Sequence, residues 1–270
     1  MIQNRAIFKN KNYHRYIYMK LFFSFLLLIT ICSIANKAFA QPKAYSVYNA
    51  HSHNDYANDT PFYKAFQKGF GSIEADIYPI DGELFVAHNK KDISKENTLT
   101  KMYLQPLLKE LNKSPNRKVQ LLIDIKENYA VALPLLINQL QPLKKFYTNG
   151  RVLILISGNR PLPAEYANYP DYISFDDDLI HPHTPEQWKR VGLVSLQFTV
   201  FTKWKGDSTI AREDEDRLRR VINAVHNAGK PIRFWDAPDT VASWQEQMKL
   251  GVDFIGTDKI EALGNFLNNH

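Results

Sequence analysis

Five histidine and acidic residues lie close together in the segment from Asn49 to Asn89. They are His51, His53, Glu74, Asp76 and His88. Residues i and i+2 of an extended strand point to the same side, so the first two histidines should face one way together, as should the two carboxylates. Two carboxylates on one face repel each other unless a cation or a shared proton compensates, and nearby histidines exchange protons near neutral pH. The segment therefore predicts a metal-assisted acid–base site.

A third carboxylate and a lysine follow on a later apolar segment. Asp124 and Lys126 are two residues apart at the end of the apolar run 119–125. An unpaired carboxylate inside an apolar strand is costly, which favours Glu74, Asp76 and Asp124 as metal ligands over solvated or ion-paired groups. Oxygen ligands favour one hard divalent cation, Mg²⁺ or Ca²⁺. Lys126 could neutralise a developing oxyanion or simply pair with Asp124.

Two other functions fit parts of this pattern. His51 and His53 could be the H-x-H pair of a zinc amidohydrolase or phosphoesterase barrel, although such sites need further histidines on later strand ends, where this sequence offers none. A catalytically silent barrel that binds phosphosugars or lipids is the third possibility, because fold does not fix function. The sequence has no phosphate-binding GxxxxGK[ST], dinucleotide-binding GxGxxG or serine-hydrolase GxSxG motif.

Apolar segments rich in β-branched residues alternate with helical segments along the chain. Strands are expected at 46–51, 72–78, 119–125, 151–157, 172–176, 192–197, 231–235 and 253–257. Helices are expected at 61–69, 98–112, 130–140, 212–228, 240–250 and 260–268. Asp81-Gly82 predicts a tight turn that extends the second strand as a hairpin. Eight such units in about 230 residues predict a single-domain TIM-like (β/α)8 barrel, with an open doubly wound sheet as the competing fold.

In a TIM barrel the active site lies at the carboxyl ends of the strands, so polar and aromatic residues there should act together. Besides the metal ligands and histidines, several residues at strand ends are candidates for binding substrate. They are His53, Asn54, Gln197, Arg233 and Trp235.

The first forty residues have the features of a signal peptide. A basic region precedes an apolar run at 21–34, which at about 14 residues is short for a membrane span, and Ala38-Phe39-Ala40 predicts cleavage before Gln41. Translation could also begin at Met19. We therefore expect residues 41–270 to form one exported domain, periplasmic or extracellular, with no stable membrane span.

The same forty residues explain the net charge. They hold six Lys or Arg and no acidic residue, which accounts for the formal charge of +6 and leaves 28 basic and 28 acidic residues. Cys32, the only cysteine, also lies there, so the mature domain would have no thiol. The basic character gives no argument for nucleic-acid binding. The oligomeric state is not indicated.

Three short motifs resemble a known group of enzymes. Ala50-His51, Glu74-x-Asp76 and the segment from Asp81-Gly82 to His88 resemble the glycerophosphodiester phosphodiesterase branch of the phosphatidylinositol-specific phospholipase C-like superfamily. His51-Ser-His-Asn-Asp-Tyr56 is closer to the altered inheritance of mitochondria protein 6 family. Weaker similarity continues through Ser195-Leu-Gln-Phe, Arg233-Phe-Trp-Asp-Ala-Pro-Asp and Gly251-Val-Asp-Phe-Ile-Gly-Thr-Asp.

This resemblance implies a secreted barrel that hydrolyses a glycerophosphodiester or phospholipid-type substrate with one divalent metal and two histidines. It implies that Glu74, Asp76 and Asp124 hold the metal. It further implies that His51 and His88 are the acid–base pair and that Lys126 contacts the phosphate. His53 would then orient the phosphate or replace one of the pair.

The sequence departs from the glycerophosphodiesterases at two places. The P-E-N-T motif that follows their first histidine is replaced by His53-Asn-Asp-Tyr56, and Asp124-Ile-Lys126 is more like sphingomyelinase D. The replaced motif leaves the substrate head group open but not the chemistry. The sequence does not decide whether water or a substrate hydroxyl is the nucleophile.

Overall fold

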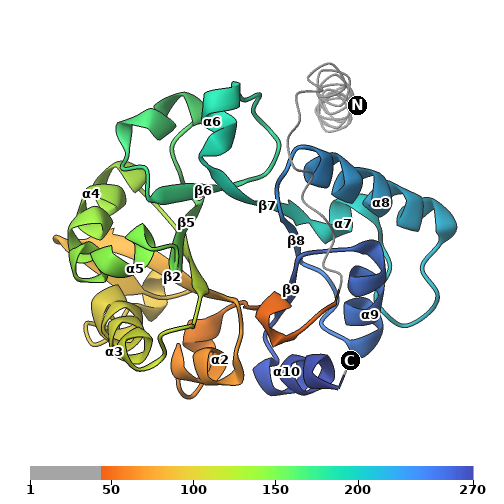
Figure 1. Cartoon of the computed structure of the whole chain (residues 1–270), viewed down its shortest axis with the longest axis horizontal. Coiled ribbons are helices and arrows are strands. Elements are labelled where there is room, and N and C mark those ends of the chain that lie inside the picture. The colour runs from red at the N-terminus through yellow and green to blue at the C-terminus, as the bar shows by residue number, and fades with distance from the viewer. Residues whose placement is uncertain (1–43, 270) are drawn as a thin grey trace, which may run out of the picture.

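The computed structural model describes residues 44–269, whose strands close into a barrel (Figure 1). Nine strands in this part of the chain form one sheet in the order β1-β9-β8-β7-β6-β5-β4-β2-β3, and β1 also pairs with β2 and closes the ring. The strands are β1 (Ala50–Ser52), β2 (Ser72–Ile80), β3 (Glu83–Val86), β4 (Val119–Ile125), β5 (Val152–Gly158), β6 (Ile173–Asp177), β7 (Val191–Gln197), β8 (Ile232–Trp235) and β9 (Phe254–Thr257). All neighbours pair in parallel except β3, which is antiparallel to β2. The predicted TIM-like barrel is confirmed.

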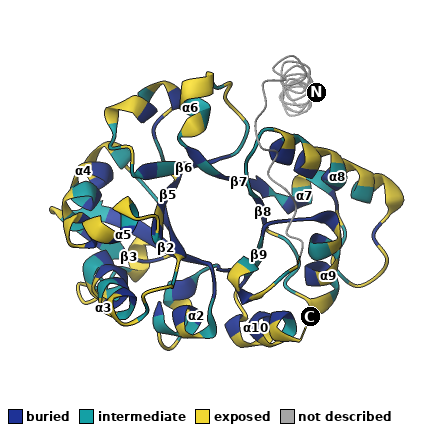
Figure 2. Ribbon diagram, viewed as in Figure 1, coloured by how far each residue is buried: buried dark blue, intermediate teal, exposed yellow. Residues whose placement is uncertain are grey.

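Helices surround the barrel and bury one face against it (Figure 2). The longer ones are α2 (Tyr63–Lys68), α3 (Gln105–Lys113), α4 (Tyr129–Gln139), α8 (Arg212–Asn227), α9 (Val241–Leu250) and α10 (Ile260–Asn268). Shorter turns of helix are η1 (Val47–Asn49), η2 (Asp55–Ala57), η3 (Lys90–Asp92), η4 (Thr100–Leu104), η5 (Gln141–Leu143), α5 (Lys144–Thr148), η6 (Pro163–Asn168), α6 (Pro185–Lys189) and α7 (Phe198–Phe201). Apolar side chains between the helices and the sheet form the main core.

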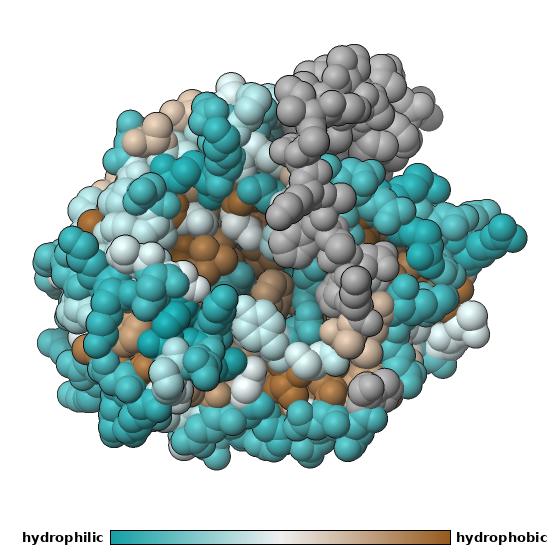
Figure 3. All heavy atoms as spheres, viewed as in Figure 1, coloured by the Kyte–Doolittle hydropathy of each residue, from teal (hydrophilic) through white to brown (hydrophobic). Residues whose placement is uncertain are grey.

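The barrel interior changes from apolar to polar along the strands. Leu122, Leu155 and Leu193 pack together inside, with Phe254 against them. Two residues further along the same strands, and therefore on the same face, stand Asp124, Ser157 and Ser195. The period of two residues thus places an apolar layer beneath a polar layer at the carboxyl ends. Figure 3, which looks along the barrel, shows apolar side chains near its centre and mostly hydrophilic ones around its periphery.

Most predicted elements are found within a few residues of their expected bounds. The first strand begins later than expected because residues 47–49 form η1, whose first turn is capped by the Ser46 side chain. The predicted hairpin is formed, with Asp81 and Gly82 at φ of 49° and 82° as a two-residue turn requires. The expected signal peptide lies outside the described residues. No helix of the described part has the length and apolar character needed to span a membrane.

Candidate active site at the carboxyl ends of the strands

The three predicted metal ligands meet at one point. Parallel pairing of β2 with β4 sets Asp76 beside Asp124, and Glu74 precedes Asp76 by two residues on the same face. One ligand atom from each carboxylate lies within 4.8 Å of the others. Oδ1 of Asp76 is buried and has no hydrogen-bond partner in the described structure. A buried oxygen without a partner, beside two more carboxylates, fits a hard divalent cation.

A glycine makes room for the third carboxylate. A Cβ atom added to Gly158, at the end of β5, would lie 2.1 Å from Oδ1 of Asp124 and 2.6 Å from the carbonyl oxygen of Ile125. Gly158 also has φ of +69°, where other residues are strained. Asp124 can therefore occupy this position only because residue 158 is a glycine, which has no side chain.

The electrostatics of Asp124 agree with a metal site. Burial raises the pKa of this carboxyl to about 6; Lys126 opposes the shift, and the charges of Asp76 and Glu74 add to it. Lys126 Nζ lies 2.8 Å from Asp76 Oδ2 and 3.3 Å from Asp124 Oδ2. One lysine thus faces three carboxylates, and a divalent cation would offset the remaining negative charge.

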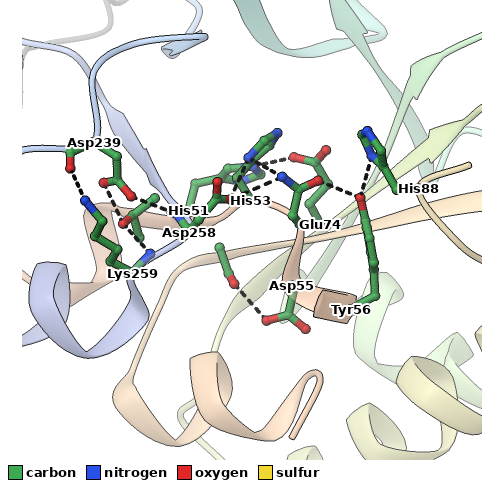
Figure 4. A network of polar contacts seen from close by, with 12 residues as sticks. His51, His53, Asp55, Tyr56, Glu74, His88, Asp239, Asp258 and Lys259 are labelled. Carbon is green, nitrogen blue, oxygen red and sulfur yellow. Dashed lines mark hydrogen bonds and ion pairs between the residues drawn. The ribbon is translucent and has the colours of Figure 1, made fainter. Parts of the chain in front are cut away.

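His53 lies beyond the end of β1 and is bound to an aspartate. Its Nδ1 is 2.8 Å from Oδ1 of Asp258, and its side chain is 39% exposed (Figure 4). Burial alone would lower the pKa of His53, but the hydrogen bond to Asp258 and the charge of Glu74 outweigh it and raise the pKa. Asp258 is itself fixed, because its backbone N–H donates to Asp239 Oδ2.

His88 lies on the other side of Glu74 from His53 (Figure 4). It follows β3, and its Nδ1 lies 3.2 Å from Asp76 Oδ2 and 3.0 Å from the hydroxyl of Tyr56. Its side chain is 60% exposed. Its ring stacks on that of Tyr56, with the two planes 23° apart.

His51 has different surroundings from the other two histidines. It is fully buried, with Nδ1 2.7 Å from Ser72 Oγ and Nε2 2.7 Å from Glu74 Oε2. Arg233 Nη1 lies 2.6 Å from the same Nε2. Burial lowers the pKa of His51 to about 4, and the charge of Arg233 adds to the effect. Both ring nitrogens are therefore occupied within the protein.

Arg233 supports the metal ligand from inside the barrel. Its guanidinium is buried, donates through Nη1 to Glu74 Oε2 at 3.2 Å, and donates through Nε to Ser195 Oγ at 2.7 Å. Burial alone would raise the pKa of Glu74, but Arg233 and the hydrogen bond with His51 hold it well below its usual range. Glu74 therefore remains a carboxylate.

The remaining predicted substrate residues lie near the carboxyl ends but do not all converge. Trp235 ends β8 and is 43% exposed. Gln197 ends β7 and donates to Asp236 Oδ2 at 3.1 Å. The amide nitrogen of Asn54 is 3.3 Å from Asp258 Oδ1. Arg233 is buried, in contrast to the exposed Trp235 two residues later on the same strand.

The H-x-H zinc alternative gains no support from this geometry. Within residues 44–269, the group of side chains placed to share a cation consists of the three carboxylates, without His51 or His53. Each of those histidines is bound instead to a carboxylate on a neighbouring strand or loop.

The sequence motif at His51–Tyr56 includes Tyr56 but predicts no role for its side chain. Asp258 and Gly158 also had no assigned partner, because each acts on a residue from another strand. An acidic residue directly after the last strand is the one signal that could have indicated Asp258.

Comparisons with known proteins agree with this fold and with the predicted family resemblance. Residues 43–116 match the family model of the AIM6-like phosphodiesterase domain. The chain is 25% identical over 256 residues to the altered inheritance of mitochondria protein 6 homolog of Arthroderma benhamiae, covering 78% of this chain and 81% of the relative. The corresponding protein of Lachancea thermotolerans is 25% identical over 274 residues, covering 78% of this chain and 63% of the relative.

The predicted family resemblance is thus confirmed, and the matching domain is a phosphodiesterase domain, in agreement with the predicted enzyme class. Among solved structures, a glycerophosphodiester phosphodiesterase from Parabacteroides distasonis has a similar fold, with a TM-score of 0.53 and 13% identity. The similarity covers 85% of this chain and 99% of that one.

Proposed function

We propose that this relative of the altered inheritance of mitochondria protein 6 family is an exported, metal-dependent phosphoric diester hydrolase. Glu74, Asp76 and Asp124 would hold one divalent cation, Mg²⁺ or Ca²⁺, and two histidines would exchange protons on either side of it. The apolar run and A-x-A sequence before residue 41 support export.

The observation that carries the proposal is the matched setting of His53 and His88. Each has Nδ1 beside an aspartate, at 2.8 Å from Asp258 and 3.2 Å from Asp76, and each side chain is partly exposed. An aspartate at Nδ1 fixes the proton there and leaves Nε2 to face a substrate. Two such imidazoles flanking a carboxylate cluster fit a displacement that needs one base and one acid.

His53 suits this role better than His51, which the sequence motif favoured. The ring nitrogens of His51 are used by Ser72 on one side and by Glu74 on the other. We assign His51 and Arg233 to holding Glu74 in place as a metal ligand.

The residues present suggest how the reaction proceeds. A bound divalent cation would offset the charge that develops on a phosphate oxygen. Lys126, whose Nζ lies 2.8 Å from Asp76, would contact the same phosphate. His53, whose pKa is raised by the hydrogen bond to Asp258 and the charge of Glu74 against the effect of burial, would protonate the leaving alkoxide, and His88 would take the proton of the attacking water or substrate hydroxyl.

The substrate class follows from these groups. The cation and Lys126 would contact the phosphate oxygens, and the exposed Trp235 offers an apolar surface to a glycerol or lipid portion. We therefore propose a glycerophosphodiester or a phospholipid-type diester.

A panel of diesters tests the proposal. Glycerophosphocholine, glycerophosphoinositol, lysophospholipids and cyclic nucleotides should be incubated with purified protein, with and without Mg²⁺ or Ca²⁺. We expect turnover of at least one glycerol-based diester that requires a divalent cation and is lost in His53→Ala and His88→Ala. Saturable binding without turnover across the panel would instead support a silent binding barrel.

A further inference from the structure

The hydroxyl of Tyr56 lies at the meeting point of three groups of the site. It is 3.0 Å from His88 Nδ1 (Figure 4), 2.7 Å from Asp76 Oδ2 and 2.5 Å from Asn54 Oδ1. A tyrosine hydroxyl donates one proton and can accept others. Because carboxylate and amide oxygens can only accept, the hydroxyl shares its one proton between Asp76 Oδ2 and Asn54 Oδ1 and accepts from Nδ1 of His88.

Asn54 continues this chain toward the other histidine. Its Oδ1 accepts from Tyr56, so its amide nitrogen faces the opposite way, 3.3 Å from Asp258 Oδ1 and 3.0 Å from His53 Nδ1. Since His53 Nδ1 donates to Asp258, the Asn54 amide donates to the same carboxylate. A continuous polar chain thus joins His88 to His53 through the side chains of Tyr56 and Asn54 and the carboxylate of Asp258.

Asp55, the residue between Asn54 and Tyr56, fixes this loop to the protein interior. Asp55 is fully buried and accepts hydrogen bonds from Ser52 Oγ at 2.7 Å, from Tyr103 at 3.0 Å and from the backbone N–H of Phe62. Asn54 has φ of 46°, in the left-handed region, which turns the chain sharply after β1. The anchored Asp55 and the turn at Asn54 direct the side chains of residues 54 and 56 toward the histidines.

We propose that Asn54 and Tyr56 form a bridge that positions both acid–base histidines relative to the metal ligands. The bridge is a positioning device: the Tyr56 hydroxyl and both ends of the Asn54 amide are already bonded within the protein. It holds each ring with Nδ1 protonated and Nε2 directed away from the bridge. The bridge rests on the proposed function where it is tested by kinetics. The spectroscopic test of the hydrogen bonds does not depend on that function.

Three substitutions test the bridge. Tyr56→Phe removes only the hydroxyl. Asn54→Gly removes the amide and keeps a residue that tolerates positive φ. Tyr63→Phe, in the neighbouring helix α2, is the matched control, because within the described residues its hydroxyl has no hydrogen bond.

The kinetic readout separates positioning from binding. We expect Tyr56→Phe and Asn54→Gly each to lower kcat roughly 10-fold to 100-fold, as loss of a supporting hydrogen bond typically does. KM in both variants should stay within about threefold of wild type. The Kd for Mg²⁺, measured by calorimetry, should stay within the same range in Asn54→Gly, because Asn54 contacts no metal ligand. The kcat of the double variant Tyr56→Phe/Asn54→Gly should be little lower than that of the slower single variant. Both substitutions break the same chain of hydrogen bonds, so their effects should not add.

The structural readout needs no turnover. In side-chain ¹⁵N spectra of the metal-free protein, Tyr56→Phe should shift the signals of His88 and also those of His53, which Tyr56 does not touch. Tyr63→Phe should shift neither. Unmoved His53 signals, a kcat within twofold of wild type, a loss expressed in KM, or a loss of Mg²⁺ affinity in Asn54→Gly would each overturn the bridge. Absence of turnover in the wild type would refute the proposed function, and the spectra would still decide whether the bridge exists.

Discussion

His53 Nδ1 lies 2.8 Å from the carboxylate of Asp258, although the two residues are 205 positions apart in the chain. The first and last strands of the barrel bring them together, since β1 pairs with β9 through His51 and Gly256 and through Ser52 and Thr257. The backbone N–H of His53 also donates to the carbonyl oxygen of Thr257 at 3.1 Å. Closure of the barrel therefore creates the histidine–aspartate pair.

The first prediction concerns pH and Asp258. Burial lowers the pKa of His53, whereas the hydrogen bond and charge of Asp258 are among the effects that raise it, so Asp258→Asn should lower this pKa. The protonated form of His53 would then be lost at a lower pH. The pH profile of kcat has one limb that reflects the titration of His53. That limb should move to lower pH, whether His53 acts as the acid or as the base. An unchanged profile in Asp258→Asn would contradict the pairing.

A second prediction separates the two histidines of the first motif. His53→Gln and His88→Gln should lower kcat by about 10² to 10⁴, the range typical of a lost acid or base, and leave the melting temperature nearly unchanged. His51→Gln should instead cost roughly 1–3 kcal/mol of stability, because Glu74 and Arg233 lose a buried partner.

The measurements are steady-state kinetics at saturating Mg²⁺ and thermal unfolding. His51→Gln should retain a kcat within about tenfold of wild type and need more Mg²⁺ to reach it. If His51→Gln unfolds like wild type and loses as much kcat as His53→Gln, His51 is the acid–base residue after all.

Much of the fold and the metal site could be predicted because the signals are local. The strand at 119–125 is found at its predicted bounds, and alternation within β2 places Glu74 and Asp76 on one face. The partner strand adds Asp124 by parallel pairing, a rule that the (β/α)8 pattern already contains.

The setting of the histidines could not be predicted in the same way. Alternation ends with β1 at Ser52, so His53 is not part of the strand, and the turn at Asn54 decides where it points. Its partner Asp258 becomes a neighbour only through barrel closure. The roles of His51 and His53 therefore depend on burial and long-range contacts, which a motif does not contain.

The third prediction concerns the metal. Mg²⁺ at a hundred times its Kd should stabilise the wild-type protein by about 2.7 kcal/mol, because it binds the folded state alone. Asp76→Asn should abolish this stabilisation, as measured by thermal unfolding with and without Mg²⁺. Asp171→Asn, at an exposed aspartate away from the trio, is the control and should respond like wild type. An equal response in Asp76→Asn would place the cation elsewhere.

The last prediction uses two glycines with similar backbones. Gly158 and Gly150 have φ of +69° and +73°, so replacing either by alanine should cost roughly 1–2 kcal/mol from backbone strain. Only at Gly158 does the added Cβ meet the site, 2.1 Å from Asp124 Oδ1; at Gly150 it meets nothing within 4 Å. Gly158→Ala should therefore weaken Mg²⁺ binding by roughly 10-fold to 100-fold beyond its effect on stability, and Gly150→Ala should leave binding unchanged. Calorimetric titration of the folded variants with Mg²⁺ measures the difference, and equal affinities would show that Asp124 does not hold the cation.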